Sequence, residues 1–521
     1  METMTTAPLR IGTAAGRGTL LAAILASGMV FLDATVVNVA LPRLGADLGA
    51  TVADLQWTIN GYALMLAAFV LLGGALGDRF GRRRVFLFGV LWFTLASVLC
   101  GLAQGTGWLI AARILQGAGG ALLTPGSLSV LQASFHPDDR GRAIGTWAGL
   151  SGVSTALGPF VGGWLIDALS WRWIFFVNLL LAVPLVLAAL RWMPESRDED
   201  VSRRGVPGHR RRFDVLGALL GALGLAGITY ALIDAPVRGA TALPVLGAAL
   251  VGVAAAGTFV LVERRRGDGA MLPPTLFRSR PFTVLNVFTV AVYAALGGFT
   301  FFLAVHLQNV VGWSAFQTGL ATLPFTLLLL VGSARAGALA ARIGPRWPLA
   351  VGPVLAAAGL LVLRGVGPGA SYWTDVLPGV ALFGLGLTLV VAPLTASVLA
   401  AVADRFAGVA SGFNNAASRV GGLLAVAALP LLVGLSGTGY EQPAELAHAY
   451  RGALLWCAGL LLAAALLAGI LLTGTPAGKA NAAAADKPDA AAGTAAGSPA
   501  ERKGPPRDGG GPFRQLSGGR D

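Results

Sequence analysis

The sequence predicts an all-α polytopic membrane protein that crosses the bilayer fourteen times. Of its 521 residues, 55% are hydrophobic and 12% are charged, whereas roughly a quarter of the residues in soluble domains are charged. Apolar stretches of about 18 residues or more follow one another along most of the chain, and each is long enough to cross a bilayer core of about 30 Å. A soluble globular protein is therefore excluded.

The first apolar stretch is too long for the core of a signal peptide, so we expect it to remain as the first span. Cys100 and Cys457 lie in apolar stretches, and they imply neither a disulfide framework nor a metal site. In chain order, the predicted spans cover residues 20–42, 55–77, 85–103, 108–131, 144–166, 173–193, 215–233, 242–262, 282–305, 317–341, 347–363, 376–402, 409–434 and 452–473.

The distribution of basic residues predicts the orientation. With the N-terminus inside, 30 of the 38 Lys and Arg fall in cytoplasmic loops, tails and adjoining helix ends, and five fall on the outer side. Because positively charged loops stay in the cytoplasm, both termini are expected there. The net charge of +13 then faces the inner leaflet, and no nucleic-acid partner is needed to explain it.

An internal repeat predicts two related halves. The segment Gly74–Arg83 follows the second span, Gly337–Arg346 follows the tenth, and six of their ten positions match. Duplicated six-span halves are a common transporter construction, but they would place the second copy after the eighth span. We therefore expect two pseudo-symmetric six-helix bundles with two extra spans inserted between them.

This organisation gives the expected domain boundaries. The C-terminal residues are rich in Ala, Gly and Pro and lack apolar periodicity, which is typical of a disordered tail. The expected segments are a cytoplasmic N-terminus (1–19), an N-terminal bundle (20–193), a cytoplasmic linker (194–214), an inserted helix pair (215–262), a second linker (263–281), a C-terminal bundle (282–473) and a disordered cytoplasmic tail (474–521).

Asp33 is the first candidate functional residue because it lies near the middle of the first span. A charged residue in hydrocarbon costs about 2.5–3.5 kcal/mol on insertion scales, so it must face protein or water. The other 24 of the 25 acidic residues fall in predicted loops, tails or helix ends. A proton that crosses the membrane on a carboxylate would therefore have to use Asp33, and a cationic substrate is expected to compete with it.

Arg113 in the fourth span is the expected partner of Asp33. At 1.5 Å of rise per residue, Arg113 lies roughly 8 Å and Asp33 roughly 13 Å below the outer surface. The two side chains can therefore meet directly or share a water. The arginine would lower the proton affinity of the carboxylate, and protonation would free both partners. The alternative is a static ion pair that only joins the first and fourth spans.

The loop after the second span is a candidate gate. It combines one acid with several arginines and a glycine: Asp78, Arg79, Gly81, Arg82, Arg83 and Arg84. Charge-assisted hydrogen bonds in such a loop can lock helix ends together, and their release can open the cytoplasmic face. The second copy of the repeat has Ala341 at the position of Asp78, so the lock is expected only in the N-terminal half. The alternative is a solvated loop that follows the positive-inside bias.

Several segments resemble the major facilitator superfamily and, within it, the fourteen-span drug:proton antiporters. They are Leu32–Pro42 in the first span, Gly73–Arg83 after the second, Arg113–Gly120 in the fourth, Gly149–Gly163 in the fifth and Trp171–Asn178 at the entry to the sixth. The resemblance extends over residues 20–473. It implies the major facilitator fold, in which two six-helix halves rock about a central site formed by spans one, four, nine and twelve.

The fifth-span segment is rich in small residues at three- and four-residue spacing. Its motif residues are Gly149, Gly158, Pro159, Gly162 and Gly163, and Gly145 and Gly152 extend the pattern. Small residues let helices approach closely, and Pro159 removes a backbone donor and bends the helix. We expect a packed, kinked helix at the interface between the bundles. Its link to export is implied by the resemblance alone.

Polar and aromatic residues inside the spans are candidates to line a substrate cavity. They are Asn38, Tyr62, Gln116, Tyr293, Asn414, Asn415 and Arg419. Arg419 lies near mid-membrane, where it either lines the cavity or forms a hydrogen-bonded strut between helices. His306, at the predicted outer surface, is a secondary candidate proton carrier. Phe31, Phe299 and Phe302 either line the cavity or pack in the core or against lipid.

The sequence and the resemblance together predict a proton-coupled antiporter that exports organic, cationic or amphipathic drugs or antibiotics across the bacterial inner membrane by alternating access. The expected partners are a small organic substrate, protons and the lipid bilayer; the protein is expected to be a monomer, driven by the proton gradient without a cofactor or metal. It is not expected to be an enzyme, since the sequence has no Gly-x4-Gly-Lys-Ser/Thr nucleotide loop.

Two other functions remain open at this point. One is a dedicated exporter of a single endogenous lipid, metabolite or self-made antibiotic. The other, from a different class, is a transport-inactive membrane sensor. A sensor would need an ordered cytoplasmic domain, which residues 474–521 do not resemble.

Overall fold

The computed structural model describes residues 8–196, 214–267, 270, 272–403 and 406–472. Apart from an isolated β-bridge between Leu9 and Phe135, these residues form helices and their connections. The first six helices are α1 (Ala14–Leu48), α2 (Val52–Phe80), α3 (Arg82–Gly101), α4 (Thr106–Ser134), α5 (Pro137–Ala168) and α6 (Trp173–Trp192).

Eight further long helices follow, joined in places by the short helices η2 (Pro274–Arg278), η3 (Tyr372–Val376) and η5 (Gly439–Glu441). The long helices are α8 (Val215–Arg238), α9 (Leu243–Arg266), α10 (Arg280–Asn309), α11 (Ala315–Ile343), α12 (Arg346–Leu363), α13 (Leu377–Ala400), α14 (Ala407–Leu432) and α15 (Pro443–Leu471). Thirteen described helices are individually long and apolar enough to cross a membrane; α2, bent by 51° between Val70 and Leu72, makes the fourteenth.

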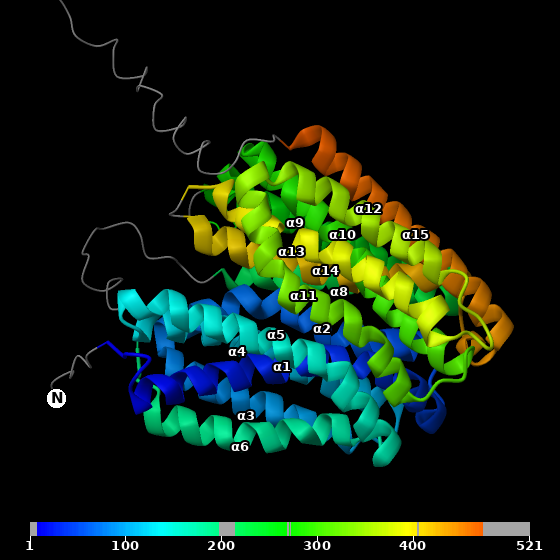
Figure 1. Cartoon of the computed structure of the whole chain (residues 1–521), viewed down its shortest axis with the longest axis horizontal. Helices are drawn as coiled ribbons and strands as arrows, with labels where there is room; N and C mark the ends of the chain where they lie inside the picture. The colour runs from blue at the N-terminus through cyan, green and yellow to red at the C-terminus, as the bar shows by residue number, and fades with distance from the viewer. Residues whose placement is uncertain (1–7, 197–213, 268–269, 271, 404–405, 473–521) are drawn as a thin grey trace, which may run out of the picture. The chain divides into compact units, whose positions relative to one another are not determined.

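The same helix pairs pack together in both halves of the chain. In the first half, α1 packs against α5 and α6, α2 against α4, and α3 against α4 and α6. In the second half, α10 packs against α14 and α15, α11 against α13, and α12 against α13 and α15. These are two pseudo-symmetric six-helix bundles, blue to cyan-green and green to orange in Figure 1.

Two seams join the bundles. One is formed by α2 and α14 and the other by α5 and α11, while α1 and α10 pack against each other between them. The inserted helix α8 packs on its partner α9 and also on both α2 and α14, so it covers the first seam. Trp57 of α2 and Tyr230 of α8 contribute an aromatic contact there, with ring centroids 6.2 Å apart.

Local sequence determines where several helices begin and end. Thr51 opens α2 with a capping box, in which its hydroxyl accepts the Asp54 N–H at 3.2 Å and the Asp54 carboxylate accepts the Thr51 N–H at 2.9 Å. Gly49 ends α1 in the left-handed region with a φ of 59°, which costs glycine little. α15 begins at Pro443, before the predicted residue 452, because proline suits the first turn of a helix.

The predicted fold class is confirmed, including the position of the two inserted helices between the six-helix bundles. Each of the fourteen predicted spans coincides with a helix, although most helices extend beyond the predicted ends because polar residues continue them. The domain boundaries stay predictions. Most of the first predicted linker and all of the predicted disordered tail, 474–521, lie outside the described residues.

The first testable prediction concerns topology. Because basic residues concentrate on one side of the fourteen helices, both termini and the connection after α6 should be cytoplasmic. A reporter enzyme that is active only in the periplasm, fused after Pro194, should therefore be inactive, and the same reporter fused after Gly105, between α3 and α4, should be active. The reverse pattern would overturn the orientation.

Candidate functional site

Asp33 lies in the middle of α1, and its side chain is completely buried (0% exposed). Three donors from two other helices satisfy its carboxylate. Arg113 Nη1 of α4 donates to Oδ2 at 2.5 Å. Gln116 Nε2 of α4 and Asn178 Nδ2 of α6 donate to Oδ1 at 2.8 Å and 3.4 Å. The predicted pairing of Asp33 with Arg113 is therefore present as a direct ion pair.

Arg113 is held in place from several directions. Its Nε donates to the carbonyl oxygen of Thr58 in α2 at 3.1 Å, and its Nη1 also donates to Gln116 Oε1 at 2.6 Å. The guanidinium carbon lies 4.3 Å from the centroid of the Tyr62 ring, a geometry in which the aromatic face stabilises a cation. Because Arg113 and Gln116 are three residues apart on α4, both reach the same carboxylate.

Ser97 of α3 supports this network from behind. Its Oγ accepts hydrogen bonds from Gln116 Nε2 at 3.1 Å and Asn178 Nδ2 at 2.9 Å, and it donates to the Phe175 carbonyl at 3.0 Å. Cys100 Sγ lies 3.6 Å from Gln116 Oε1. Five helices of one bundle thus contribute to a polar cluster that holds the Asp33 carboxylate in a fixed position.

Because the ion pair is buried, each of its two charges depends on the other for neutralisation. The Arg113 side chain is only 2% exposed, so water screens neither charge. Losing one partner of such a pair costs about 3–5 kcal/mol because the other charge is left unpaired in a low-dielectric interior. Protonation of Asp33 would have the same effect on Arg113. In this conformation a cationic substrate cannot reach the Asp33 carboxylate. The expected direct competition between proton and substrate for Asp33 therefore does not hold in this conformation.

The predicted gate after α2 is held together by two acids rather than one. Asp78 pairs with Arg82 at 2.8 Å, as expected. Glu195, after α6, accepts the Arg83 N–H at 3.2 Å and lies 3.7 Å from Arg84, which corrects the expectation that Asp78 is the only acid of the cluster.

The same gate also depends on backbone geometry. Arg83 Nη2 donates to the Leu190 carbonyl at 2.7 Å, tying the loop to α6. Gly81 has a φ of 106°, and a Cβ there would lie 2.6 Å from Glu195 Oε1. This backbone angle and this clash require glycine at position 81. Arg79, the other arginine of the predicted gate, lies over the Phe80 ring, 5.4 Å from its centroid.

The fifth-span motif packs closely only in its second part. A Cβ at Gly158 or Gly162 would overlap Thr35 or Val36 of α1, and one at Gly163 would lie 2.5 Å from the Ala315 carbonyl of α11. Gly149 behaves differently, as does Gly145, because a Cβ at either would meet nothing within 4 Å. The expectation of close packing therefore holds from Gly158 to Gly163 and not at Gly145 or Gly149.

Some of the candidate cavity residues belong to the Asp33 network, and others form contacts elsewhere. Gln116 and the buried Tyr62 belong to the Asp33 network, and Asn38 bonds only to its own helix, at the Ala34 carbonyl. Asn414 of α14 donates to Thr289 Oγ1 at 2.7 Å and to Asn286 Oδ1 at 3.2 Å on α10.

The remaining candidates lie on α10 and α14 of the C-terminal bundle. Asn415 is exposed and Tyr293 half-buried. Arg419 of α14 is close enough to interact electrostatically with both Tyr62 and Tyr293. It thus connects the bundle that contains Asp33 with the other bundle.

One prediction on α10 needs correction, and two aromatic residues of the same helix take one of the alternatives left open for them. His306 is fully buried rather than surface-exposed: its ring stacks on Tyr450 with centroids 3.8 Å apart, and its Nε2 lies 3.0 Å from the Val366 carbonyl. Phe299 and Phe302 are also fully buried in the core, and Phe299 packs on Phe383 at 4.3 Å. Sequence position alone could not distinguish these residues from surface or cavity residues.

Hydrogen bonds between the bundles close the end of the structure that is predicted to face outward. Tyr440 donates to the Ala50 carbonyl at 2.8 Å, the Val52 N–H to the Gly437 carbonyl at 2.7 Å, and Gln308 Nε2 to the Val39 carbonyl at 2.9 Å. Burial, and then the neighbouring Glu441 carboxylate, raise the pKa of Tyr440, so its phenol stays protonated as a donor.

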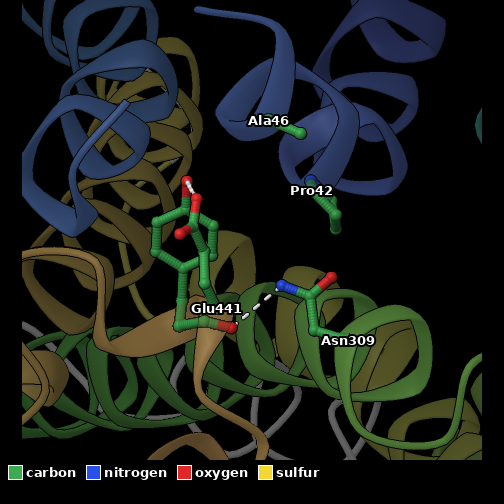
Figure 2. A pocket seen from close by; sticks show the side chains of 5 residues that line it. Pro42, Ala46, Asn309 and Glu441 are labelled. Atoms are coloured by element: carbon green, nitrogen blue, oxygen red, sulfur yellow. Dashed lines mark hydrogen bonds between the residues drawn. The ribbon is translucent and has the colours of Figure 1, made fainter. Parts of the chain in front are cut away.

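A small pocket remains beside this closure. It has a volume of about 290 Å³ and is lined by Pro42, Ala46, Asn309, Tyr440 and Glu441. In Figure 2 the α1 residues Pro42 and Ala46 face Asn309 and Glu441 across it. The pocket lies between elements of both bundles, at the place where they would part if the outer side opened.

The sequence analysis missed Ser97 and gave Asn178 no role in the site. Both are fully buried polar residues within predicted spans, and Asn178 lies in one of the segments that carry the family resemblance. A small polar residue inside an apolar span was the available signal. It was too weak to use because serine and asparagine also bond to their own helices.

Curated relatives match most of this chain. A tetracenomycin C resistance and export protein from Streptomyces glaucescens is 36% identical, covering 80% of this chain and 75% of that protein. The puromycin resistance protein pur8 from Streptomyces alboniger is 37% identical over 85% of this chain and 89% of that protein. The multidrug resistance protein Stp from Mycobacterium tuberculosis is 35% identical, with coverages of 79% and 74%.

Solved structures support the fold. A bacterial homologue of the human lysosomal transporter Spinster, in an inward-facing and unoccupied conformation, aligns with a TM-score of 0.59 at 18% identity, covering 88% of this chain and 97% of that one. The sequence profile of the Major Facilitator Superfamily matches residues 23–426 and 285–515. With this match, the close relatives and the paired six-helix bundles, the chain belongs to the major facilitator superfamily.

Proposed function

We propose that this protein exports organic, cationic or amphipathic drugs or antibiotics across the bacterial inner membrane in exchange for protons. The relatives described above, named for resistance to or export of antibiotics, support the substrate class. The observation that carries proton coupling is the sealed network of Asp33, Arg113 and Gln116. No other arrangement in the described residues places a carboxylate at mid-membrane opposite a buried arginine.

The coupling follows from charge balance in this network. While Asp33 is ionised, it neutralises Arg113 and holds it against Gln116. Once Asp33 is protonated, the guanidinium loses its counter-ion, and its remaining contacts are the Thr58 carbonyl, Gln116 and the face of Tyr62. The released charge then acts toward the region between the bundles, because Tyr62, which lies under the guanidinium of Arg113, is also influenced by the charge of Arg419 on α14.

This mechanism differs from direct competition for one carboxylate. The substrate binds between the bundles, and the proton binds inside the N-terminal bundle. The two are coupled because the charge of Arg113 contributes to the potential in the cavity. Protonation would disfavour a cationic substrate and so promote its release on the side from which the proton comes.

Alternating access would rest on the two ends of the bundle interface. The hydrogen bonds of Tyr440 and Gln308 close one end, while the opposite end of α5 is open at Gly145 and Gly149. In the outward-facing state the outer hydrogen bonds would break, and the open glycine face of α5 would pack against the other bundle.

The prediction for Asp33 separates coupling from binding. Asp33→Asn keeps the size of the side chain but removes its proton site. In everted membrane vesicles, proton-driven accumulation of ethidium, a fluorescent organic cation, should fall by at least about tenfold. Ethidium binding to the purified protein should weaken, because asparagine leaves the Arg113 charge uncompensated just as protonation does, and it should no longer depend on pH.

Asp47→Asn is the matched control for this experiment. Asp47 lies on the same helix, where it accepts the Trp171 indole N–H at 2.8 Å, and its substitution should leave accumulation near the wild-type level. Proton release on ethidium binding should disappear only in Asp33→Asn. Continued release from Asp33→Asn protein would show that another group carries the coupling.

The gate is tested by removing its acids one at a time. Asp78→Asn should weaken the tie to Arg82 and shift the protein toward the inward-open state. With Cys100 and Cys457 replaced by alanine, a cysteine introduced at the open position 145 should react faster with a maleimide. Glu195→Gln should have a similar effect because Glu195 holds the same loop. If the rate of the maleimide reaction and the rate of export both stay unchanged, these residues do not act as a gate.

The outer closure is tested through Tyr440. Tyr440→Phe removes the hydroxyl that donates to the Ala50 carbonyl, a hydrogen bond whose loss costs about 1 kcal/mol. A cysteine at position 46, on the pocket wall, should then react about fivefold faster with a maleimide. Tyr372→Phe, a tyrosine of η3 not in this closure, is the control. Equal rates in both variants would contradict the closure.

A further inference from the structure

The inserted helix pair carries a buried acidic cluster that the export mechanism does not use. Asp214 caps the start of α8, where its Oδ1 accepts the Gly217 N–H at 2.6 Å. Glu263 lies in the last turn of α9, and its Oε2 accepts the Leu272 N–H at 2.7 Å. The two carboxyl groups are within hydrogen-bonding reach of each other, at the end of the α8–α9 hairpin predicted to be cytoplasmic.

Two oxygen atoms of this pair lack a donor. Asp214 Oδ2 and Glu263 Oε1 are both buried, and neither has a hydrogen-bond partner among the described contacts. The residues themselves are 8% and 4% exposed. Buried acceptors that lack a donor are unfavourable, and one proton held by the two carboxyl groups would supply a donor to the cluster.

The charges around the two carboxyl groups also favour one bound proton in the cluster. Arg266 forms an ion pair with Asp214, so two ionised carboxylates would leave a net charge of −1 in a buried cluster, whereas one bound proton makes it neutral. Arg264 and Arg265 on the same turn of α9 are exposed. The other charged residues of α8, Asp234 and Arg238, pair at its opposite end.

The proton belongs mainly to Glu263. Burial raises the pKa of Asp214, but hydrogen bonds with Arg266, Glu263 and the Gly217 N–H outweigh this effect, and the pKa of Asp214 is lowered overall. Asp214 is thus the ionised member, held by its helix cap and its arginine. Glu263, which has no arginine partner as close, is the member that donates.

We propose that Asp214 and Glu263 bind one shared proton, forming a second protonation site that is separate from Asp33 and fastens the inserted hairpin to the C-terminal bundle. The connection runs through Leu272, which is buried in the core. Beyond it, Phe277 of η2 packs edge-on against Phe282 of α10 and Phe413 of α14, and Ser279 donates to the Ala401 carbonyl at 2.9 Å.

The shared proton has a predictable effect on stability. Burial, and then the neighbouring Asp214, raise the pKa of Glu263 to about 7, so the folded cluster keeps a proton that an unfolded glutamate has already released. Stability is therefore greatest at lower pH, decreases as the pH rises to about 7, and changes little above it. Asp214 has the opposite sign, since its lowered pKa removes stability only in strong acid. Purified full-length protein should therefore lose melting temperature as the pH rises from about 5 to about 7, by on the order of 2 °C per pH unit, with little further change up to about pH 8.5.

Glu263→Gln tests the site because glutamine can still accept the Leu272 N–H and donate to Asp214, without titrating. This variant should remove that slope and be more stable than wild type at the alkaline end. Glu445→Gln, an exposed glutamate at the start of α15, is the control and should keep the wild-type slope. A slope unchanged by Glu263→Gln would overturn the proposal.

Infrared difference spectroscopy gives a direct second readout. The carbonyl stretch of a protonated carboxyl group should vanish between acidic and alkaline samples of wild type, and that difference band should be missing in Glu263→Gln. Asp214→Asn, which replaces the like charge by an amide donor, should move the titration of the band to lower pH. If Mg²⁺ stabilises wild type but not Glu263→Gln and no carboxyl band is found, the pair binds a cation and the proton site is refuted.

Discussion

The buried ion pair between Asp33 and Arg113 is the interaction on which the N-terminal bundle depends. Polar groups from α1, α2, α3, α4 and α6 converge on these two side chains. Because each charge is hidden from water, its neutralisation must come from the other, and their geometry links the packing of five helices to one protonation equilibrium. A helix cannot shift within this bundle without disturbing these contacts, which are the contacts that the proposed proton coupling would use.

Much of this arrangement was predictable from the sequence. Fourteen apolar stretches, the displaced repeat and the mid-membrane Asp33 indicate the fold and its central charge, because hydrocarbon penalises unpaired polar groups so strongly. The partner Arg113 followed from its depth in α4. Helix length and depth are properties of a single helix, and they survive folding almost unchanged.

The rest could not be predicted because it depends on which helices meet. His306 is buried by Tyr450, which lies on a different helix; Glu195 joins the gate from the end of α6; and Gly149 has no close neighbour while Gly162 presses on Val36. In a membrane protein made of two six-helix bundles, an apolar helix face can lie either in the protein core or against lipid. Rotation about each helix axis is therefore set by tertiary packing, which one sequence does not reveal.

The position of α8 gives the two related bundles unequal borders. An exact two-fold design would have identical seams at α2–α14 and α5–α11, but α8 packs along only the first, while the main contacts of α5 and α11 are with bundle helices. A helix that packs against both bundles at one seam resists their separation there but still allows them to rotate. Among the described helices, no inserted helix packs along the second seam. Within the described part of the chain, the inserted pair covers the α2–α14 flank and not the α5–α11 flank, so an amphipathic molecule dissolved in the bilayer would meet the two flanks as different surfaces.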